Sequence, residues 1–325
     1  MNYKLLLIFL LVALMVVSPT VIGLIADGQA LENNDNTILD KSDVPDITVE
    51  LYITSTGEIK QMELDEYVCG VLLAEVPSFY EKEAVKALAV AVRSYCVRRI
   101  QNEEKKIEHF SADMCDDYSH CLGYISLEDA SVLWGENNVD AYYKIIEQAV
   151  DETRGEVVYF EGNIADAVFH ASSNGVTESA ENVWGFEIPY LVSVNSPEAS
   201  VERCIEYTPE EIKVLLEENS VMCSFNDNPQ EWIGVVEKNK NNRVDIIEFA
   251  RAKMTGRRAR EVFGLSSASF DMSYSEGKFK IKTLGSGHGV GLSMAGANSM
   301  AQDGVEYKEI LSHYYTGTEL RLFSE

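Results

Sequence analysis

Two histidines and two cysteines lie close together in the segment HFSADMCDDYSHC, which runs from His109 to Cys121. The four side chains are His109, Cys115, His120 and Cys121. Two thiolates and two neutral imidazoles are a common tetrahedral shell for Zn²⁺. Four protein ligands leave no open position for water, which is the mark of a structural zinc site. We therefore predict a structural Zn²⁺ site here and expect the reaction chemistry elsewhere in the chain.

A disulfide between Cys115 and Cys121 is the alternative, because cysteines outside the cytoplasm often pair. A disulfide, however, explains neither histidine. Adjacent residues of a regular strand point to opposite faces, so His120 and Cys121 can share one metal only if the chain turns there. The composition of the segment thus favours zinc. The chain carries no H-E-x-x-H sequence, the motif of the commonest zinc proteases.

The elements that must position these residues follow from hydrophobic spacing. Apolar residues at helical spacing predict helices at about residues 63–75, 81–99 and 139–152. Alternation and turn residues predict strands at 47–53 and 278–284, and a hairpin that turns at 161–163. This mixture predicts an α+β fold in which helices pack on a mixed or antiparallel sheet.

The middle of the chain, residues 198–270, is rich in helix formers and carries no chemical motif, so we expect it to be an inserted subdomain of the region 47–325. Cys204 and Cys223 lie in this middle region, and whether they form a disulfide is left open.

The first residues predict a location at the cell membrane. Leu5 to Ala26 carries no charge and is about long enough to cross a bilayer of ~30 Å. Lys4 precedes it, which favours an anchor (residues 1–26) with the N-terminus inside and the rest of the chain outside. A cleavable signal peptide is the alternative, but Leu24 occupies a position where its cleavage site needs a small residue. The acidic residues 27–46 are expected to form a linker next to the membrane. The net charge of −26 argues against a nucleic-acid partner.

Three ordered segments carry a family resemblance. They are LDEYVCGVLLAEVPSFYEKEAVKALAVAVRSYCVRR, ETRGEVVYFEGNIADAVFHASSNGVTESAENVWGFEIPYLVSV and GSGHGVGLSMAGANSMAQDGVEYKEILSHYYTG. Together they resemble stage II sporulation protein D, the peptidoglycan lytic transglycosylase of endospore engulfment. The resemblance spans roughly Ile47 to Phe323 and is weakest in the middle region. It implies an enzyme on the mother-cell membrane, facing the intermembrane space. The His-Cys-His-Cys pattern is similar to that of clostridial members with zinc.

The resemblance also implies the site residues. Glu75, in the motif AEVP, would be the catalytic acid. The substrate contacts would be Arg93, His170, Ser172, Ser173, Thr177, Glu178, Trp184, His288, Gly289 and Ser293. The sequence departs from the family pattern at Asn174, Met294 and Ala295, which weakens any assignment of a polar contact at position 294. Glu178 is a candidate to stabilise positive charge on the sugar.

The reaction that the resemblance implies needs one carboxyl group. Glu75 would protonate the oxygen between N-acetylmuramic acid and N-acetylglucosamine, and then accept the proton of the attacking C6 hydroxyl, giving a 1,6-anhydro product. An acid at neutral pH needs a raised pKa, and the apolar neighbours of Glu75 are consistent with that. The expected partners are peptide-stripped glycan strands, a membrane protein and an amidase.

The alternatives are a glycan-binding adaptor that recruits or activates the amidase, a serine hydrolase using Ser293, and a zinc amidase.

Overall fold

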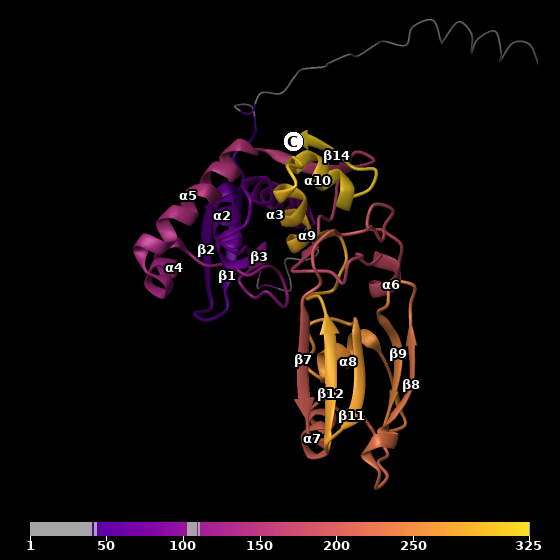
Figure 1. Cartoon of the computed structure of the whole chain (residues 1–325). Helices are drawn as coiled ribbons and strands as arrows, with labels where there is room; N and C mark the ends of the chain where they lie inside the picture. The colour runs from indigo at the N-terminus through magenta and orange to yellow at the C-terminus, as the bar shows by residue number, and fades with distance from the viewer. Residues whose placement is uncertain (1–40, 42–43, 103–108, 110, 325) are drawn as a thin grey trace, which may run out of the picture. The chain divides into compact units, whose positions relative to one another are not determined.

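The computed structural model describes residues 41, 44–102, 109 and 111–324 (Figure 1). One compact unit, Lys41–Glu325, contains all of them. Its helices are α2 (Leu64–Glu75), α3 (Lys82–Gln101), α4 (Leu127–Trp134), α5 (Glu136–Glu152), α6 (Ala180–Trp184), α7 (Pro209–Glu218), α8 (Gly256–Val262), α9 (Met294–Gln302), α10 (Tyr307–Tyr314) and the 3₁₀ helix η4 (Pro229–Trp232). The predicted α+β class is confirmed.

The strands form several small sheets. Their bounds are β1 (Thr48–Ile53), β2 (Glu58–Glu63), β3 (Met114–Cys115), β4 (Glu156–Phe160), β5 (Asn163–Ile164), β6 (Phe169–His170), β7 (Glu202–Tyr207), β8 (Ile233–Lys238), β9 (Val244–Phe249), β10 (Ala252–Thr255), β11 (Phe270–Ser275), β12 (Lys278–Leu284), β13 (Leu292–Ser293) and β14 (Glu319–Leu322). The sheet orders are β2-β1-β3, β10-β9-β8, β11-β12-β7, β13-β6 and β14-β4-β5. Most neighbouring strands are antiparallel; β1 with β3 and β6 with β13 are parallel.

The prediction of a single-pass membrane protein is corrected. Across the part of the chain that the structure describes, none of the helices combines the length and the apolar character needed to cross a bilayer. The segment on which the prediction depended, Leu5 to Ala26, lies outside the described residues, as does most of the predicted linker 27–46.

Helix α3 is the centre of the first buried cluster. Its apolar residues are buried on nearly all sides, because α2, α5, α9, α10 and β4 all pack against it (Figure 1). Its residues Val85, Leu88, Ala89, Val92 and Cys96 are fully buried, whereas Tyr95 is half-buried. A helix that is apolar all round belongs inside a core. Helix α3 therefore fixes the position of α2, which carries Glu75 at its end.

A second buried cluster lies in the middle region of the chain. It is built on strands β7–β12 and helices α7 and α8, with the aromatic residues Trp232, Phe249, Phe263, Phe270 and Phe279 at its centre. The strand pairs of this region are all antiparallel. The subdomain boundaries stay a prediction. Cys204 and Cys223 are free thiols in this region, so the structure contains no disulfide between them.

Candidate functional site

Glu75 is the last residue of α2. The helix ends there because Pro77 follows closely, and proline disfavours a helical conformation in the residue before it. The Glu75 side chain is half-buried. Its Oε1 accepts a hydrogen bond from the backbone N–H of Gly123 at 2.8 Å. Within the described residues this is the only hydrogen bond of the Glu75 carboxylate, so one oxygen is held and the other is available to a ligand.

The segment around Gly123 lies along α2. Besides the bond to Glu75, the backbone N–H of Ile125 donates to the carbonyl of Gly70 at 3.3 Å. The ring of Tyr124 lies over Gly70, where a Cβ atom would come within 2.2 Å of the ring carbon Cε2. Gly70 is therefore required for the close approach of this segment to the helix. These contacts set where the Gly123 donor meets the Glu75 carboxylate.

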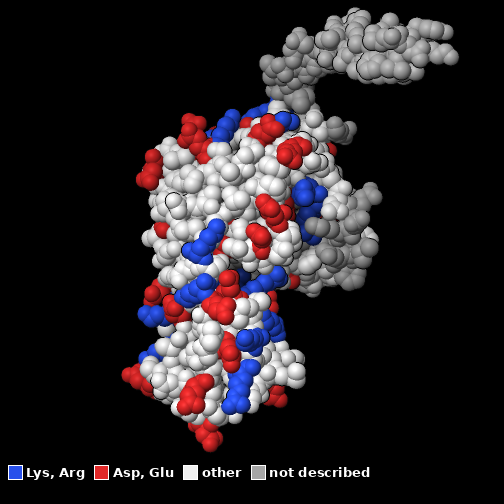
Figure 2. All heavy atoms as spheres, turned by 90° about the vertical axis from the view of Figure 1, so that its right-hand side faces the viewer, with Lys and Arg blue, Asp and Glu red and all other residues white. Residues whose placement is uncertain are grey.

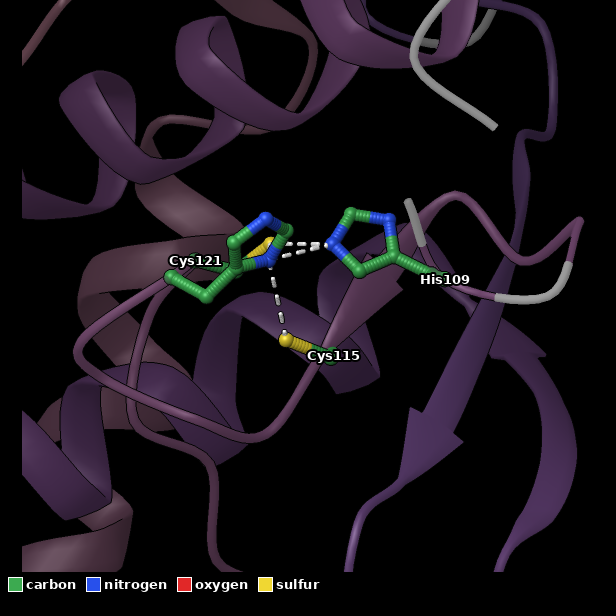
Figure 3. A group of neighbouring side chains, drawn as sticks. His109, Cys115 and Cys121 are labelled. Carbon is green, nitrogen blue, oxygen red and sulfur yellow. Dashed lines mark hydrogen bonds between the residues drawn. The ribbon is translucent and has the colours of Figure 1, made fainter. Parts of the chain in front are cut away.

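The four predicted metal ligands converge into one cluster. Their ligand atoms all lie within 4.8 Å of one another. The Sγ atoms of Cys115 and Cys121 are each 3.6 Å from Nδ1 of His120. His109 Nε2 lies 3.1 Å from the Cys121 Sγ and 2.7 Å from the His120 Nδ1. Figure 3 shows the His109, Cys115 and Cys121 side chains pointing toward one another.

A tight turn brings the two neighbouring ligands to the same side. The backbone N–H groups of His120 and Cys121 both donate to the carbonyl of Asp117, at 3.1 and 2.8 Å. The Asp117 carboxylate in turn accepts the backbone N–H of Ser119 at 2.8 Å. This is the turn that a shared metal requires of adjacent residues. Cys115 is placed separately, on β3, where it pairs with Tyr52 of β1.

The cluster can hold a metal ion. In a tetrahedral zinc site with bonds of about 2.0–2.3 Å, the ligand atoms are roughly 3.3–3.8 Å apart. The cysteine–His120 distances match that range, and an ion would spread the closer contacts of His109 by a few tenths of an ångström. Burial raises the pKa of the Cys121 thiol to about 12. A divalent cation would stabilise the thiolate against this burial.

The cluster is linked to Glu75 through the backbone of Gly123. Only Leu122 separates the ligand Cys121 from Gly123. An ion held by the four side chains would therefore fix the backbone of the donor that holds the Glu75 carboxylate. Sequence reasoning missed Gly123, because a glycine next to a metal ligand carries no signal of its own.

His170, Trp184 and His288 form an aromatic group at the predicted substrate contacts. The His288 ring centroid is 5.7 Å from that of His170 and 5.7 Å from that of Trp184. Parallel pairing of β6 with β13 places His170 beside this group. Burial lowers the pKa of His288 to about 4, and nearby Arg260 and Arg243 act in the same direction. Burial also lowers the pKa of His170 well below its ordinary value. Both imidazoles are therefore neutral at pH 7.

The Glu178 side chain is buried and hydrogen-bonded within the protein. Its side chain is 1% exposed and accepts hydrogen bonds from Asn239, Asn241 and Asn182 at 2.6–2.8 Å. The Arg243 guanidinium lies 3.6 Å from the Glu178 carboxylate. Buried charges need partners of this kind. Glu178 thus joins its loop to the 239–243 segment, and the suggestion that it stabilises charge on a sugar stays a prediction.

Ser173 and Ser293 also form hydrogen bonds inside the protein. Both are fully buried, and both donate to Oε1 of Glu198, from the Ser173 backbone N–H at 2.7 Å and from the Ser293 hydroxyl at 2.6 Å. Burial raises the pKa of Glu198, but these and further hydrogen bonds outweigh it, and the pKa is lowered. Ser293 also caps α9. Sequence reasoning missed Glu198, because no motif surrounds it.

Arg93 has a structural position. Its guanidinium is 1% exposed, donates to Asp65 at 3.0 Å, and donates to the carbonyls of Val150, Thr153 and Glu156. A guanidinium with these partners has no donor directed at solvent. Arg93 therefore braces α2 against α5, and its predicted contact with substrate stays a prediction.

The other predicted substrate contacts include Thr177, Ser172 and Gly289. Thr177 is fully buried and accepts the Val194 N–H at 2.9 Å. Ser172 is buried and exchanges backbone bonds with Ser286. Gly289 has a φ of 87°, and a Cβ there would lie 2.5 Å from Arg243. Trp184 and His288 alone among the predicted contacts are half-buried rather than buried. Across the described residues, no hydrogen bond joins Glu75 to any of them.

Comparisons with known proteins find relatives that match most of the chain. A family model described as SpoIID, stage II sporulation protein, matches residues 52–160, which include Glu75, Gly123 and the four cluster residues. Stage II sporulation protein D of Bacillus amyloliquefaciens is 32% identical over 276 residues, covering 84% of this chain and 78% of that protein. The protein of the same name from Bacillus subtilis (strain 168) is 30% identical over 274 residues, covering 84% and 79%.

A more distant relative has a different name. The amidase enhancer of Bacillus subtilis (strain 168) is 23% identical over 303 residues, which cover 77% of this chain and 40% of that protein. None of the names mentions a metal, so the clostridial type of zinc pattern stays a prediction.

Proposed function

The chain belongs to the stage II sporulation protein D family, which gives it a role in sporulation, and from this premise we propose that it is a peptidoglycan lytic transglycosylase. Its substrate would be glycan strands stripped of peptides, and its bond the one between N-acetylmuramic acid and N-acetylglucosamine, cut during engulfment. The observation that carries the proposal is the half-buried Glu75 carboxylate, with one oxygen held by Gly123 and the other open.

One carboxyl group suffices for this reaction. Glu75 in its acid form gives a proton to the bridging oxygen, and the C1–O bond breaks. The C6 hydroxyl of the same muramic ring attacks C1 and returns its proton to the Glu75 carboxylate. The product ends in a 1,6-anhydro ring and no water is consumed. Because the nucleophile is tethered to the ring it attacks, its effective concentration is high.

Two buried carboxylates, those of Glu178 and Glu198, are consistent with a single-acid mechanism rather than ordinary hydrolysis. Glycosidases usually need a second carboxyl to act as base or nucleophile. Glu178 and Glu198 are both buried and accept several hydrogen bonds, so neither is available for that role. Gly123 would keep the Glu75 carboxylate in one orientation while its charge changes.

The metal that we propose for the cluster is a structural Zn²⁺ held by His109, Cys115, His120 and Cys121. When bound, zinc supplies positive charge that stabilises the two thiolates. The residues of the turn then keep Gly123 in place against α2. A zinc amidase is not supported, because four protein ligands leave no position for a reactive water.

A serine hydrolase is not supported either. The Ser293 hydroxyl is fully buried and donates to Glu198, and none of the described histidines is hydrogen-bonded to it. A nucleophilic serine needs a base within hydrogen-bond reach.

The second candidate function is a glycan-binding adaptor that recruits or activates an amidase. The likeness to an amidase enhancer favours it. Under this alternative the chain would bind strands without cutting them.

One pair of variants distinguishes the two proposed functions. Glu75→Gln keeps the size of the side chain but removes the acid, while Glu66→Gln makes the same change at an exposed position of α2. As a transglycosylase, the Glu75→Gln protein binds peptide-free strands and releases no soluble fragments, while Glu66→Gln works as the wild type does. As an adaptor, all three proteins release nothing on their own and stimulate a partner amidase equally.

A further inference from the structure

Two strongly exposed aromatic side chains lie on the two segments that meet at the Glu75–Gly123 hydrogen bond. Among the Phe, Tyr and Trp residues that the structure describes, Tyr118 and Phe79 are the most exposed, at 82% and 73%. Phe79 follows Glu75 by four residues, and Tyr118 precedes Gly123 by five. A single exposed ring needs no explanation, but the two most exposed rings on either side of one carboxylate contact indicate a binding surface. We call Phe79 and Tyr118 the exposed ring pair.

Phe79 lies in a turn that the protein holds in place. The backbone N–H of Tyr80 donates to the carbonyl of Pro77 at 3.1 Å and closes the turn. Just before it, the carbonyl of Val76 accepts the hydroxyl of Tyr142 at 2.6 Å. The Phe79 ring stands edge-on to the buried Tyr80 ring, with centroids 5.3 Å apart and planes at 66°. One face of the Phe79 ring is therefore supported from below while most of the ring meets solvent.

Tyr118 lies in the turn of the candidate metal cluster. The carbonyl of Asp117 accepts the backbone N–H groups of His120 and Cys121, and the Asp117 carboxylate accepts the N–H of Ser119 at 2.8 Å. These bonds enclose Tyr118, whose side chain points out of the turn. An aromatic side chain has only two rotatable bonds, so fixing it against a ligand costs little entropy when its backbone is already held.

The charge of the chain favours a contact of this uncharged kind. The net charge is −26, and a strand with lactyl carboxylates is also acidic. Figure 2 shows Lys and Arg side chains interspersed with Asp and Glu on one face of the molecule. The overall field of such a chain does not attract an anionic strand. Affinity for the strand then has to come from contacts that do not depend on charge.

We propose that Phe79 and Tyr118 are platforms for sugar rings of the glycan strand on which Glu75 acts. A pyranose ring has an apolar C–H face, and a flat aromatic ring can cover that face and remove it from water. The chain places the Cα atom of Phe79 at most about 14 Å from that of Glu75, so the platform serves sugars near the bond that is cut. The assignment rests on the proposed function for the identity of the strand, and it adds how that strand is held.

The test measures binding without turnover, in the Glu75→Gln protein. Isothermal titration calorimetry compares peptide-free muramyl strands with neutral chitin oligosaccharides. Phe79→Leu and Tyr118→Leu keep an apolar side chain but remove the flat face. Each should weaken binding of both ligands by roughly five- to thirtyfold, the range of a well-placed aromatic contact. Added salt should leave these factors unchanged, because the contact carries no charge.

Three control variants show whether the ring itself is recognised. Phe79→Tyr and Tyr118→Phe keep the flat face and should bind nearly as tightly as the parent protein. Trp134→Leu removes a 47% exposed ring from α4 and should leave binding unchanged. Thermal unfolding of each variant checks the fold, and zinc content checks the turn around Tyr118. If Tyr118→Leu loses zinc, the Phe79 variants decide the matter, because their turn contains none of the candidate metal ligands.

Three results would overturn the proposal. They are unchanged binding in both leucine variants of the exposed ring pair, an equal loss in Trp134→Leu, and losses in Phe79→Tyr and Tyr118→Phe as large as those in the leucine variants. The proposed function fails by a different result, namely no anhydro product from the wild-type protein. Binding by the Glu75→Gln protein does not depend on that product, so the two failures are distinguishable.

Discussion

The backbone N–H of Gly123 donates to the carboxylate of Glu75 at 2.8 Å, and Gly123 stands two positions after a cysteine of the metal cluster. The last residue of α2 is therefore oriented by a loop far away in the sequence. A Cβ atom at position 123 would lie 2.8 Å from Oε1 of Glu75. The absence of a side chain at Gly123 is thus a condition for the position of this carboxylate.

Gly123→Ala tests that relationship. The added methyl group meets the free end of a flexible side chain, so Glu75 can move aside at little cost in stability. A displacement of about 1 Å at a catalytic group can lower the rate roughly 100-fold. We expect kcat to fall by about one to two orders of magnitude, with the free energy of unfolding changed by less than ~1 kcal/mol. An unchanged kcat would show that the hydrogen bond from Gly123 does not position the acid.

Removal of the metal should act through the same loop. Chelation, or Cys121→Ser, should release one equivalent of zinc and speed amide exchange in residues 111–125, because a structural ion stabilises the segment that holds it. Turnover should fall as amide exchange in this segment becomes faster. Amide exchange in β11 and β12, which belong to the second buried cluster, serves as the internal control. Loss of turnover with unchanged exchange would instead indicate a catalytic metal.

The cluster of four candidate metal ligands was largely predictable from sequence, and the contact of Gly123 with Glu75 was not. His109, Cys115, His120 and Cys121 were recognisable because few residue types bind zinc and all four lie in one short segment. The turn at Asp117 could be deduced from the adjacency of His120 and Cys121. The contact of Gly123 with Glu75 depends on how the loop packs on α2, which no local pattern encodes.

Ser293→Ala separates a structural serine from a nucleophile. The hydroxyl donates to Glu198 at 2.6 Å and accepts the Gly296 N–H at the start of α9. Loss of a helix cap and of a bond to a buried carboxylate should lower the free energy of unfolding by about 1–3 kcal/mol in urea titrations. The folded variant should still release glycan fragments. A fully stable variant with no turnover would favour the serine hydrolase.

Acid should destabilise the protein through His288 and His170. Burial lowers the pKa of His288 to about 4, against about 6.5 in the unfolded chain. Between these values the unfolded state binds more protons, so the free energy of unfolding falls as the pH drops from 7 toward 4. The contribution of His288 is on the order of 2–3 kcal/mol, and His170 adds to it in the same direction.

The measurement is urea unfolding of the wild type and of His288→Gln at pH 7 and at pH 4.5. From pH 7 to pH 4.5, the free energy of unfolding of His288→Gln should fall by less than that of the wild type. An identical loss in both proteins would show that His288 titrates normally in the folded state.

The buried loop contacts explain why the family resemblance predicted more substrate residues than the structure exposes. Ser173, Ser293 and Glu178 belong to motifs, but their side chains complete buried hydrogen-bond networks. A motif shows that a residue is required, without separating a role in folding from a contact with substrate. The partners that decide the matter, Glu198 and Asn241, lie outside any motif and meet these residues only in the folded chain.

The middle region shows a second limit of prediction from sequence. Residues 198–270 are rich in helix formers, yet about half of their regular structure is in strands β7–β10. Helix propensity is worth less than about 1 kcal/mol per residue, and burial of the aromatic side chains between the hairpins outweighs it. By contrast, α2, α3 and β12 agree closely with their predicted ranges, because their apolar residues keep a regular period.

The central claim is that Glu75 serves as both acid and base in one ring closure. It is tested most directly by mass spectrometry of the fragments that the wild-type protein releases from peptide-free glycan strands. The account predicts fragments with 1,6-anhydro ends, each lighter by one water than the fragment a hydrolase would give, and none from Glu75→Gln. Reducing ends from the wild type, or anhydro ends from Glu75→Gln, would contradict it.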